Sequence, residues 1–448
     1  MERQKRLIKL AGPIFVELLL AMLLGIIDIF MLSQYDDRAA GAVGASNQII
    51  NNLNLIFAII SAGTAVLVAQ NVGANNKEEI EKVSAVSLIM NFIVGIIISL
   101  GMIVFGEPIL KGIGVTPDLM HYAYEYTSIV GGALSFQAVL NTLSAIIRSH
   151  GYTKQSMYIS AGMNIINIIG DAVFVFGLFG APVLGVKGVA IATTFSRICA
   201  VIVAFVFLIR SMLSVKVFSR LKEKPMYILK ELFSIGFPAA MENMSYSLSQ
   251  TVLMSIILTN LGDMAYITRT YVWQISWLTA IFVIAIGQAN QIIIGQLVGG
   301  GNIEEAYETG FSNLKIAMGF SIVGAIVLFF FGEVLTGIFS KNPAILMLGG
   351  ATLMVDAFLE PGRVFNVILI NGLRGAGDVI FPVVMAMVSM WSFGVAGGYI
   401  FGVVLGFGLP GIWMGMVIDE WFRGICMFFR WKNRKWARRW QLKQEYIL

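Results

Sequence analysis

The two halves of the sequence repeat each other in the same direction. Residues Gln70 to Glu79 read QNVGANNKEE, and the segment that starts 226 residues later at Gln296 keeps the same residue at six of these ten positions. Further matches recur at offsets of 225 or 226: Arg148 and Arg374, Gly151 and Gly377, and Pro13-x-x-x-Glu17 and Pro238-x-x-x-Glu242. A repeat of about half the chain predicts two similar structural units within one polypeptide.

The composition places both repeats in a membrane. Hydrophobic residues make up 57% of the chain, charged residues make up 13%, and the mean hydropathy is +0.81. A soluble domain would carry about 25% charged residues. Apolar stretches long enough to cross a hydrocarbon core of about 30 Å recur along the whole length, so we expect no soluble domain of useful size. This excludes a soluble enzyme and a DNA-binding module.

Twelve apolar segments, six in each half, predict twelve transmembrane helices. Continuous apolar runs of about 20 residues exclude the alternating pattern of a membrane β-barrel. The predicted fold is therefore all-α and integral to the membrane, with two pseudo-symmetric six-helix bundles around a central cleft, an arrangement typical of transporters. We expect an amino-terminal lobe at residues 1–211, a linker at 212–228, and a carboxy-terminal lobe with a basic tail at 229–448.

The distribution of Lys and Arg predicts the orientation of the chain. These residues concentrate before the first span, in the 212–228 linker and after the last span. The positive-inside rule then places both termini in the cytoplasm of a multi-pass protein of the inner, or plasma, membrane. The net charge of +5 follows from this bias and from contact with anionic lipid, so no nucleic-acid partner is expected.

Ionisable side chains inside the spans are the candidates for function, because each is costly in lipid and normally faces the protein interior. Asp28 lies in the first span, and the fifth span carries Asn164, Asn167 and Asp171 at i, i+3 and i+7, on one helical face. We expect Thr193 of the sixth span at a similar depth. Such sheltered oxygen atoms suit a proton or Na⁺. The alternative is that Asp28 and Asp171 only join helices through polar contacts.

The second half has charges of its own. Glu242 lies near the middle of the seventh span without an obvious local partner, so it is either a second cation site or a contact for a cationic substrate. Local spacing favours simple neutralisation for two other acids: Glu360 with Arg363 at i, i+3, and Asp419 with Arg423 at i, i+4. Arg197 in the sixth span is expected to be a counter-ion for an acid of the first half.

Six short motifs, in order and at matching spacing, resemble the multidrug and toxic compound extrusion (MATE) family. They are Gly25-Ile-Ile-Asp28, Gln70-Asn-Val-Gly73-Ala, Arg148-Ser-His-Gly151-Tyr-Thr-Lys, Asn167-Ile-Ile-Gly-Asp171, Gly185-Val-Lys-Gly188-Val-Ala-Ile-Ala192-Thr193 and Asn371-Gly-Leu-Arg374-Gly-Ala-Gly377-Asp378. The resemblance covers nearly the whole chain. It implies export of organic, often cationic and aromatic, compounds in exchange for H⁺ or Na⁺.

Within that family, the chain resembles the DinF-like branch. The resemblance implies that Asp28, Asn167 and Asp171 bind the coupling cation and that Thr193 contributes a hydroxyl. In the NorM-like branch an acid lies in the seventh span about eight residues after the proline, where this chain has Tyr246. This departure argues against a cation site in the second half. We expect Glu242, Tyr246 and Asn164 to contact substrate instead.

The sequence also indicates how transport would be powered. It contains no Gly-rich nucleotide-binding loop, so energy is expected from an ion gradient, with no cofactor beyond the coupling ion. The expected partners are small drug-like molecules and membrane lipid, and the expected state is a monomer without enzymatic activity. Two alternatives stay open: a flippase of the same superfamily for lipid-linked oligosaccharide or peptidoglycan precursors, and a non-transporting membrane scaffold or receptor.

Overall fold

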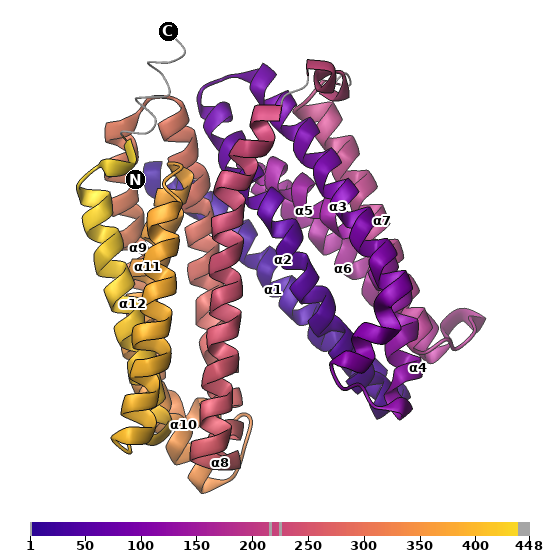
Figure 1. Ribbon diagram of the computed structural model, residues 1–448, viewed down its shortest axis with the longest axis vertical. Coiled ribbons are helices and arrows are strands. Elements are labelled where there is room, and N and C mark those ends of the chain that lie inside the picture. Colours follow the sequence, from indigo (N-terminus) through magenta and orange to yellow (C-terminus); the bar gives the residue numbers. More distant parts are fainter. Residues whose placement is uncertain (1, 215–216, 224–225, 438–448) are drawn as a thin grey trace. The chain divides into compact units, whose positions relative to one another are not determined.

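The computed structural model describes residues 2–214, 217–223 and 226–437, and this part of the chain is helical with no strand (Figure 1). The predicted all-α fold is therefore confirmed. The end of the expected basic tail, residues 438–448, and four residues of the expected linker, 215–216 and 224–225, lie outside the described residues.

Each half of the chain forms a series of long helices. The first half contains α1 (Glu2–Tyr35), α2 (Asp37–Gly73), α3 (Lys77–Gly112), α4 (Pro117–Tyr126), α5 (Leu134–Ser149), α6 (Thr153–Phe176) and α7 (Val186–Ser211). A short 3₁₀-helix, η3 (Val217–Glu223), follows α7. The second half contains α8 (Met226–Gly299), α9 (Ile303–Thr336), α10 (Pro343–Gly375), α11 (Ile380–Ser389) and α12 (Gly408–Lys432).

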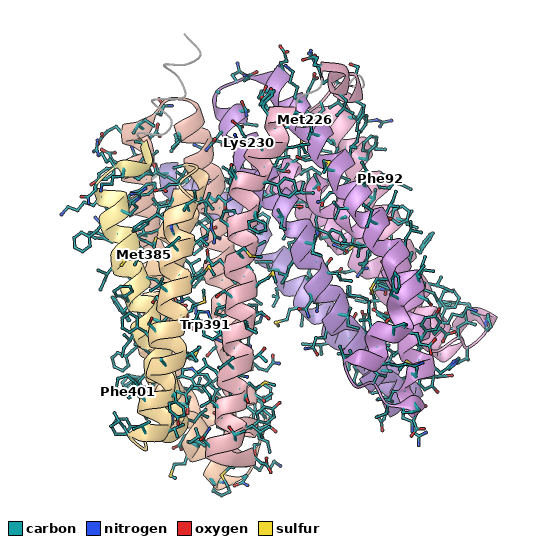
Figure 2. All side chains as sticks on the ribbon, in the orientation of Figure 1. Phe92, Met226, Lys230, Met385, Trp391 and Phe401 are labelled. Carbon is teal, nitrogen blue, oxygen red and sulfur yellow. The ribbon has the colours of Figure 1, made fainter. Side chains whose placement is uncertain are left out.

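These helices give the twelve predicted spans within the described residues. Nine of them are long and apolar enough to cross a membrane, where α11 is continued to Val404 by the π-helices η4 (Met390–Gly397) and η5 (Ile400–Val404). The bent pair α4 and α5 makes a tenth span. The 74 residues of α8 are two helices joined at Gly262, whose φ of 80° breaks the helix, so α8 counts twice. The remaining span is α12, whose charged residues lower its hydropathy. Helices such as α3 carry exposed apolar side chains, among them Phe92, as expected where a helix meets lipid (Figure 2).

The sequence repeat folds into matching local structures. Where α2 meets α3, the backbone N–H of Asn76 donates to the carbonyl of Asn71 at 3.0 Å; where α8 meets α9, the N–H of Asn302 donates to the carbonyl of Leu297 at 2.9 Å. After α5 and after α10, the repeated glycines adopt the same left-handed conformation, with φ of 90° at residue 151 and 86° at residue 377. The repeat is therefore present in the structure as well as in the sequence.

The described chain forms two compact units. The amino-terminal unit comprises the described residues of Val16–Val72 and Asn76–Phe237, and the carboxy-terminal unit comprises those of Met1–Phe15, Gly73–Asn75 and Pro238–Leu448. The first turns of α1 belong to the carboxy-terminal unit because their side chains bind there: Arg3 forms an ion pair with Glu308 at 2.8 Å. The start of α8 belongs to the amino-terminal unit, where Gly236 packs so closely on the carbonyl group of Ile59 that a Cβ atom would clash with it.

Candidate functional site

The helix α6 positions three buried polar side chains inside the amino-terminal unit. Asn164, Asn167 and Asp171 are 5%, 1% and 0% exposed, respectively. Their spacing of three and four residues places them on one face, as the sequence predicted. That face meets α7 closely, because Gly170 has no side chain: a Cβ atom there would lie 2.7 Å from the Cβ of Ala192.

The close packing of α6 on α7 brings the predicted cation-site residues together. The side-chain N–H₂ group of Asn167 donates to Asp171 Oδ1 at 3.4 Å and to Thr193 Oγ1 at 3.2 Å. Asp28, which is 7% exposed, reaches the same place from α1, where its carboxyl group interacts with that of Asp171. The structure therefore gathers four predicted residues from three helices, and we call them the polar cluster (Asp28, Asn167, Asp171 and Thr193).

Several oxygen atoms of this region have no hydrogen-bond donor among the described residues. They include Asp28 Oδ1, Asn164 Oδ1, Asn167 Oδ1 and Asp171 Oδ2, all of them buried. A buried acceptor without a partner normally costs free energy, so such groups are rare unless they bind something. These oxygens are of the type that accepts a proton or coordinates a hard cation.

Two further residues border the polar cluster. Arg197 lies one turn after Thr193 on α7, and its charge acts on Asp28, as expected for a counter-ion. Tyr126, which is 2% exposed, interacts with the same groups, and its hydroxyl donates to Asn47 Oδ1 at 3.1 Å. The sequence reasoning did not include Tyr126, because a single tyrosine in an apolar span gives no periodic signal.

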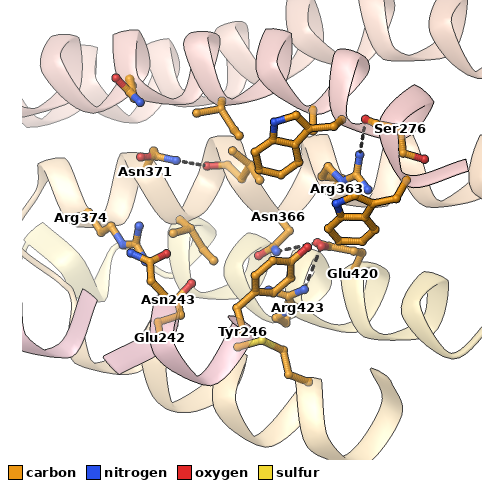
Figure 3. Close-up of a pocket in the computed structure, with 18 residues that line it drawn as sticks. Glu242, Asn243, Tyr246, Ser276, Arg363, Asn366, Asn371, Arg374, Glu420 and Arg423 are labelled. Atoms are coloured by element: carbon orange, nitrogen blue, oxygen red, sulfur yellow. Dashed lines mark hydrogen bonds and ion pairs between the residues drawn. The ribbon is translucent and has the colours of Figure 1, made fainter. Parts of the chain in front are cut away.

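The carboxy-terminal unit contains a cavity of about 390 Å³ (Figure 3). Glu242 and Tyr246, both predicted to contact substrate, line it. Asn164, the third predicted substrate residue, lies beside the polar cluster in the amino-terminal unit instead. Trp273 and Trp277 add an aromatic wall that the sequence reasoning missed, although their spacing of four residues places them on one face of α8.

The expectation that Glu242 lacks a local partner agrees with the described residues, but the structure adds a distant partner. No partner is near in sequence, but Arg374 of α10, 132 positions later, binds the Glu242 carboxylate at 2.5 Å. Both side chains line the cavity (Figure 3). Glu242 is therefore not an isolated charge.

The two predicted local ion pairs are both present. Arg363 binds Glu360 at 2.5 Å, and Arg423 binds Asp419 at 2.6 Å. Arg423 also binds Glu420 at 2.9 Å, which extends the second pair into a group of three charges. Glu360 is thus paired with an arginine of its own, whereas Asp419 and Glu420 share Arg423.

A further acid of α10 is held by hydrogen bonds instead of by an ion pair. Asp356, which is fully buried, accepts from the hydroxyl of Ser276 and from the indole N–H of Trp413, the latter at 3.0 Å. Both donors are distant in sequence, which is why local spacing gave no indication of them.

These features define a class of protein: a multi-pass membrane transporter made of two repeated helical units, with buried polar groups at membrane depth. The model of the MatE family matches residues 13–173 and 238–400, one segment in each repeat, so the chain belongs to the MATE family. This is a family of transporters and not of enzymes.

Similar proteins extend over the whole chain. A Bacillus subtilis protein named "Uncharacterized transporter YisQ" is 41% identical over 437 residues, which cover 97% of this chain and 95% of that protein. A Thermotoga maritima protein named "Probable multidrug resistance protein NorM" is 27% identical, with 100% and 96% covered. A solved structure of a MATE in the bent conformation has a TM-score of 0.89 at 21% identity, covering 99% of this chain and 97% of that one, and so shows the same fold.

Proposed function

We propose that the protein is a secondary active multidrug antiporter. It exports small organic compounds, cationic or aromatic, in exchange for H⁺ or Na⁺ by alternating access. It acts as a monomer in the plasma membrane with both termini in the cytoplasm. One observation carries this proposal: Asp28 and Asp171, from two different helices, meet in the buried polar cluster.

The polar cluster is the proposed site of the coupling cation. A pair of carboxylates inside apolar helices is costly, and Asn or Ser would join helices at lower cost. Cation binding neutralises the pair, so it lowers the free energy of a conformation that buries these acids more than that of a conformation that exposes them. A ligand shifts a conformational equilibrium only when its binding free energy differs between the two conformations in this way. This is the property that an antiporter requires of its coupling site.

The cavity of the carboxy-terminal unit is the proposed substrate site. Tyr246, Trp273 and Trp277 offer aromatic faces, which attract both flat apolar molecules and cations. The cavity lining carries two acids, Glu242 and Glu420, and three arginines, Arg363, Arg374 and Arg423. Directly behind the wall lie the acids Asp356, Glu360 and Asp419 and the arginine Arg269, which brings the total to five acids and four arginines. This excess favours a cationic substrate. The NorM relatives named as multidrug resistance proteins support drug-like substrates of several kinds.

The test is ion-driven transport by purified protein in liposomes. Wild-type protein should accumulate a fluorescent organic cation such as ethidium when a proton or Na⁺ gradient of the correct direction is imposed. Asp28→Asn should lower this rate at least 100-fold, because the cluster then holds one carboxylate fewer. Asp118→Asn, at an exposed position of α4, is the matched control and should transport as the wild type does.

Two results would reject the proposal. Undiminished gradient-driven transport by Asp28→Asn would remove the polar cluster as the coupling site. Failure of the wild type to move any organic cation, combined with translocation of a lipid-linked saccharide in the same liposomes, would favour a flippase.

A further inference from the structure

The side chain of Arg197 brings a permanent positive charge to the polar cluster. Arg197 and Thr193 are four residues apart on α7 and so share a face of that helix. Thr193 Oγ1 accepts from Asn167, so this face is turned toward α6 and Asp171. Nη1 of Arg197 is buried and has no hydrogen-bond partner in the described part of the chain. The guanidinium group therefore has unused donor capacity beside the polar cluster, where its charge acts on Asp28.

Four titratable groups from four helices lie in or beside the polar cluster. They are Asp28 of α1, Tyr126 of α4, Asp171 of α6 and Arg197 of α7. The Arg197 charge acts on both Asp28 and Tyr126. It forms no ion pair with an acid within the described residues, in contrast to Arg363, Arg374 and Arg423 of the carboxy-terminal unit. Arg197 thus acts on the cluster through its charge while its Nη1 donor remains free.

The charge count of the cluster follows directly. A guanidinium group stays protonated in proteins, so two ionised carboxylates and Arg197 sum to a single negative charge. One monovalent cation makes the cluster neutral. Without Arg197, the same two carboxylates would require two such cations.

The nature of that one cation also depends on Arg197. A bound proton becomes part of a neutral carboxyl group, which Arg197 does not repel. A Na⁺ ion keeps its full charge, needs several oxygen ligands around it, and is repelled by a guanidinium group in a medium of low dielectric constant.

We propose that Arg197 is the built-in counter-cation of the polar cluster and restricts it to one proton per transport cycle. This inference rests on the proposed function, in which the polar cluster is the coupling site. It adds Arg197 as a residue that determines ion selectivity, because its fixed positive charge takes the place of the charge of a second cation.

The experiment compares ion dependence in wild type, Arg197→Gln and Arg197→Lys. Purified protein in liposomes is supplied with either a proton gradient or a Na⁺ gradient at constant pH, and ethidium transport is recorded. Equilibrium binding of ²²Na⁺ to detergent-solubilised protein gives a second readout. Arg210→Gln removes an exposed arginine from the end of the same helix and is the matched control.

The wild type should be driven by the proton gradient alone and should bind no more ²²Na⁺ than Asp171→Asn does. Arg197→Gln should bind ²²Na⁺ at least ten-fold more tightly and should be driven by a Na⁺ gradient. Arg197→Lys and Arg210→Gln should keep the wild-type preference for protons. If Arg197→Gln does not fold, as judged by size-exclusion chromatography, the proposal is tested by ²²Na⁺ binding to the wild type and to Asp171→Asn. Equal binding supports the proposal, and stronger binding by the wild type overturns it.

Two outcomes would overturn the role of Arg197 while leaving the antiporter intact. One is ²²Na⁺ binding by the wild type that Asp171→Asn abolishes. The other is the same proton-only dependence in Arg197→Gln as in the wild type. Failure of the proposed function itself looks different, because Asp28→Asn would then transport ethidium as fast as the wild type under every gradient.

Discussion

The two compact units contain the same ion pair, built from matching positions of the repeat. In the amino-terminal unit, Arg148 at the end of α5 binds Glu17 of α1 at 3.3 Å. In the carboxy-terminal unit, Arg374 at the end of α10 binds Glu242 of α8 at 2.5 Å. Each pair joins the first span of a repeat to its fourth. The repeat therefore preserves a specific contact between helices in addition to a pattern of apolar residues.

The two copies differ in how the acid is supported. The hydroxyl groups of Ser156 and Ser160 on α6 also donate to the Glu17 carboxylate, at 3.1 and 3.2 Å. Glu242 has Arg374 as its donor and faces the cavity. Both units thus use this acid in an ion pair. Only Glu242, in the carboxy-terminal unit, also lines a cavity in which a ligand could reach it.

The remaining acids separate the units further. Asp28 and Asp171 face each other with one guanidinium nearby, and each keeps a buried oxygen without a donor in the described part of the chain. In the carboxy-terminal unit, Glu360 and Asp419 each bind an arginine. The two units therefore differ in how their buried acids are partnered: Asp28 and Asp171 keep oxygens without a donor, whereas Glu360 and Asp419 are paired with arginines.

Breaking the Glu242–Arg374 pair should give the largest change in stability. Arg374→Ala removes the partner of the Glu242 carboxylate, whose side chain is only 12% exposed. We expect this to lower the free energy of unfolding by about 3 kcal/mol. Thermal unfolding of the purified protein in detergent measures the effect. Glu242→Gln in the same chain should recover most of the loss, because the unpaired charge is then absent.

An exposed lysine of α9 provides the control for this series. Lys315→Ala should unfold within about one degree of the wild type, because surface charges contribute little. Equal unfolding temperatures for Arg374→Ala and for the double variant would show that the unpaired acid is not the cause of the loss.

The matching change in the other unit should be milder. Arg148→Ala removes the arginine from Glu17, but Ser156 and Ser160 still donate to the carboxylate, so we expect a loss of about 1 kcal/mol. Adding Ser156→Ala should bring the loss close to that of Arg374→Ala in the same unfolding measurement. A cost for Arg148→Ala alone that equals the cost for Arg374→Ala would contradict this account of the difference.

Much of this architecture could be predicted from the sequence, because it depends on local regularities. Apolar runs of sufficient length predicted the spans, and the spacing of Asn164, Asn167 and Asp171 predicted their common face. The pair of Glu360 and Arg363 is three residues apart on one helix and needed no tertiary information. In each case the contact follows from helix geometry alone.

Contacts between distant segments could not be predicted in the same way. Glu242 and Arg374 are separated by 132 positions, and Asp356 receives a hydrogen bond from Trp413, 57 positions later. One signal for the first pair was nevertheless present. Glu17 recurs as Glu242 and Arg148 recurs as Arg374, at offsets of 225 and 226, and the joint duplication of an acid and a base indicates an ion pair.

The two units differ least in the segments that follow the sixth span of each repeat, because each segment is held by an ion pair to the helix that follows the repeated Gln-x-Val-Gly motif. In the amino-terminal unit, η3 returns to the acidic start of α3, where Lys82 binds Glu223 at 2.8 Å. In the carboxy-terminal unit, Arg434 binds Glu304 at the start of α9 at 2.6 Å. Glu223, Arg434 and Glu304 are exposed and Lys82 is partly exposed, so each contact stabilises its segment only slightly.

Acid should loosen η3. The hydrogen bond from Lys82, followed by that from Arg220, lowers the pKa of Glu223 below its ordinary value. A lowered pKa in the folded state stabilises the contact above the ordinary pKa of about 4.3, and this stabilisation is lost as the pH falls through the lower value. Hydrogen exchange of the 217–223 backbone, corrected for intrinsic rates, should therefore rise several-fold between pH 5 and about pH 3.

Glu223→Gln should show the faster exchange already at pH 7, with no further rise on acidification, because no carboxylate remains to protonate. Glu107→Gln removes another surface acid of the same unit, the partner of Lys111, and is the matched control. Its η3 segment should exchange as in the wild type at every pH. A pH-dependent rise that persists in Glu223→Gln would assign the loosening to another group and would remove the contact between Glu223 and Lys82 as its cause.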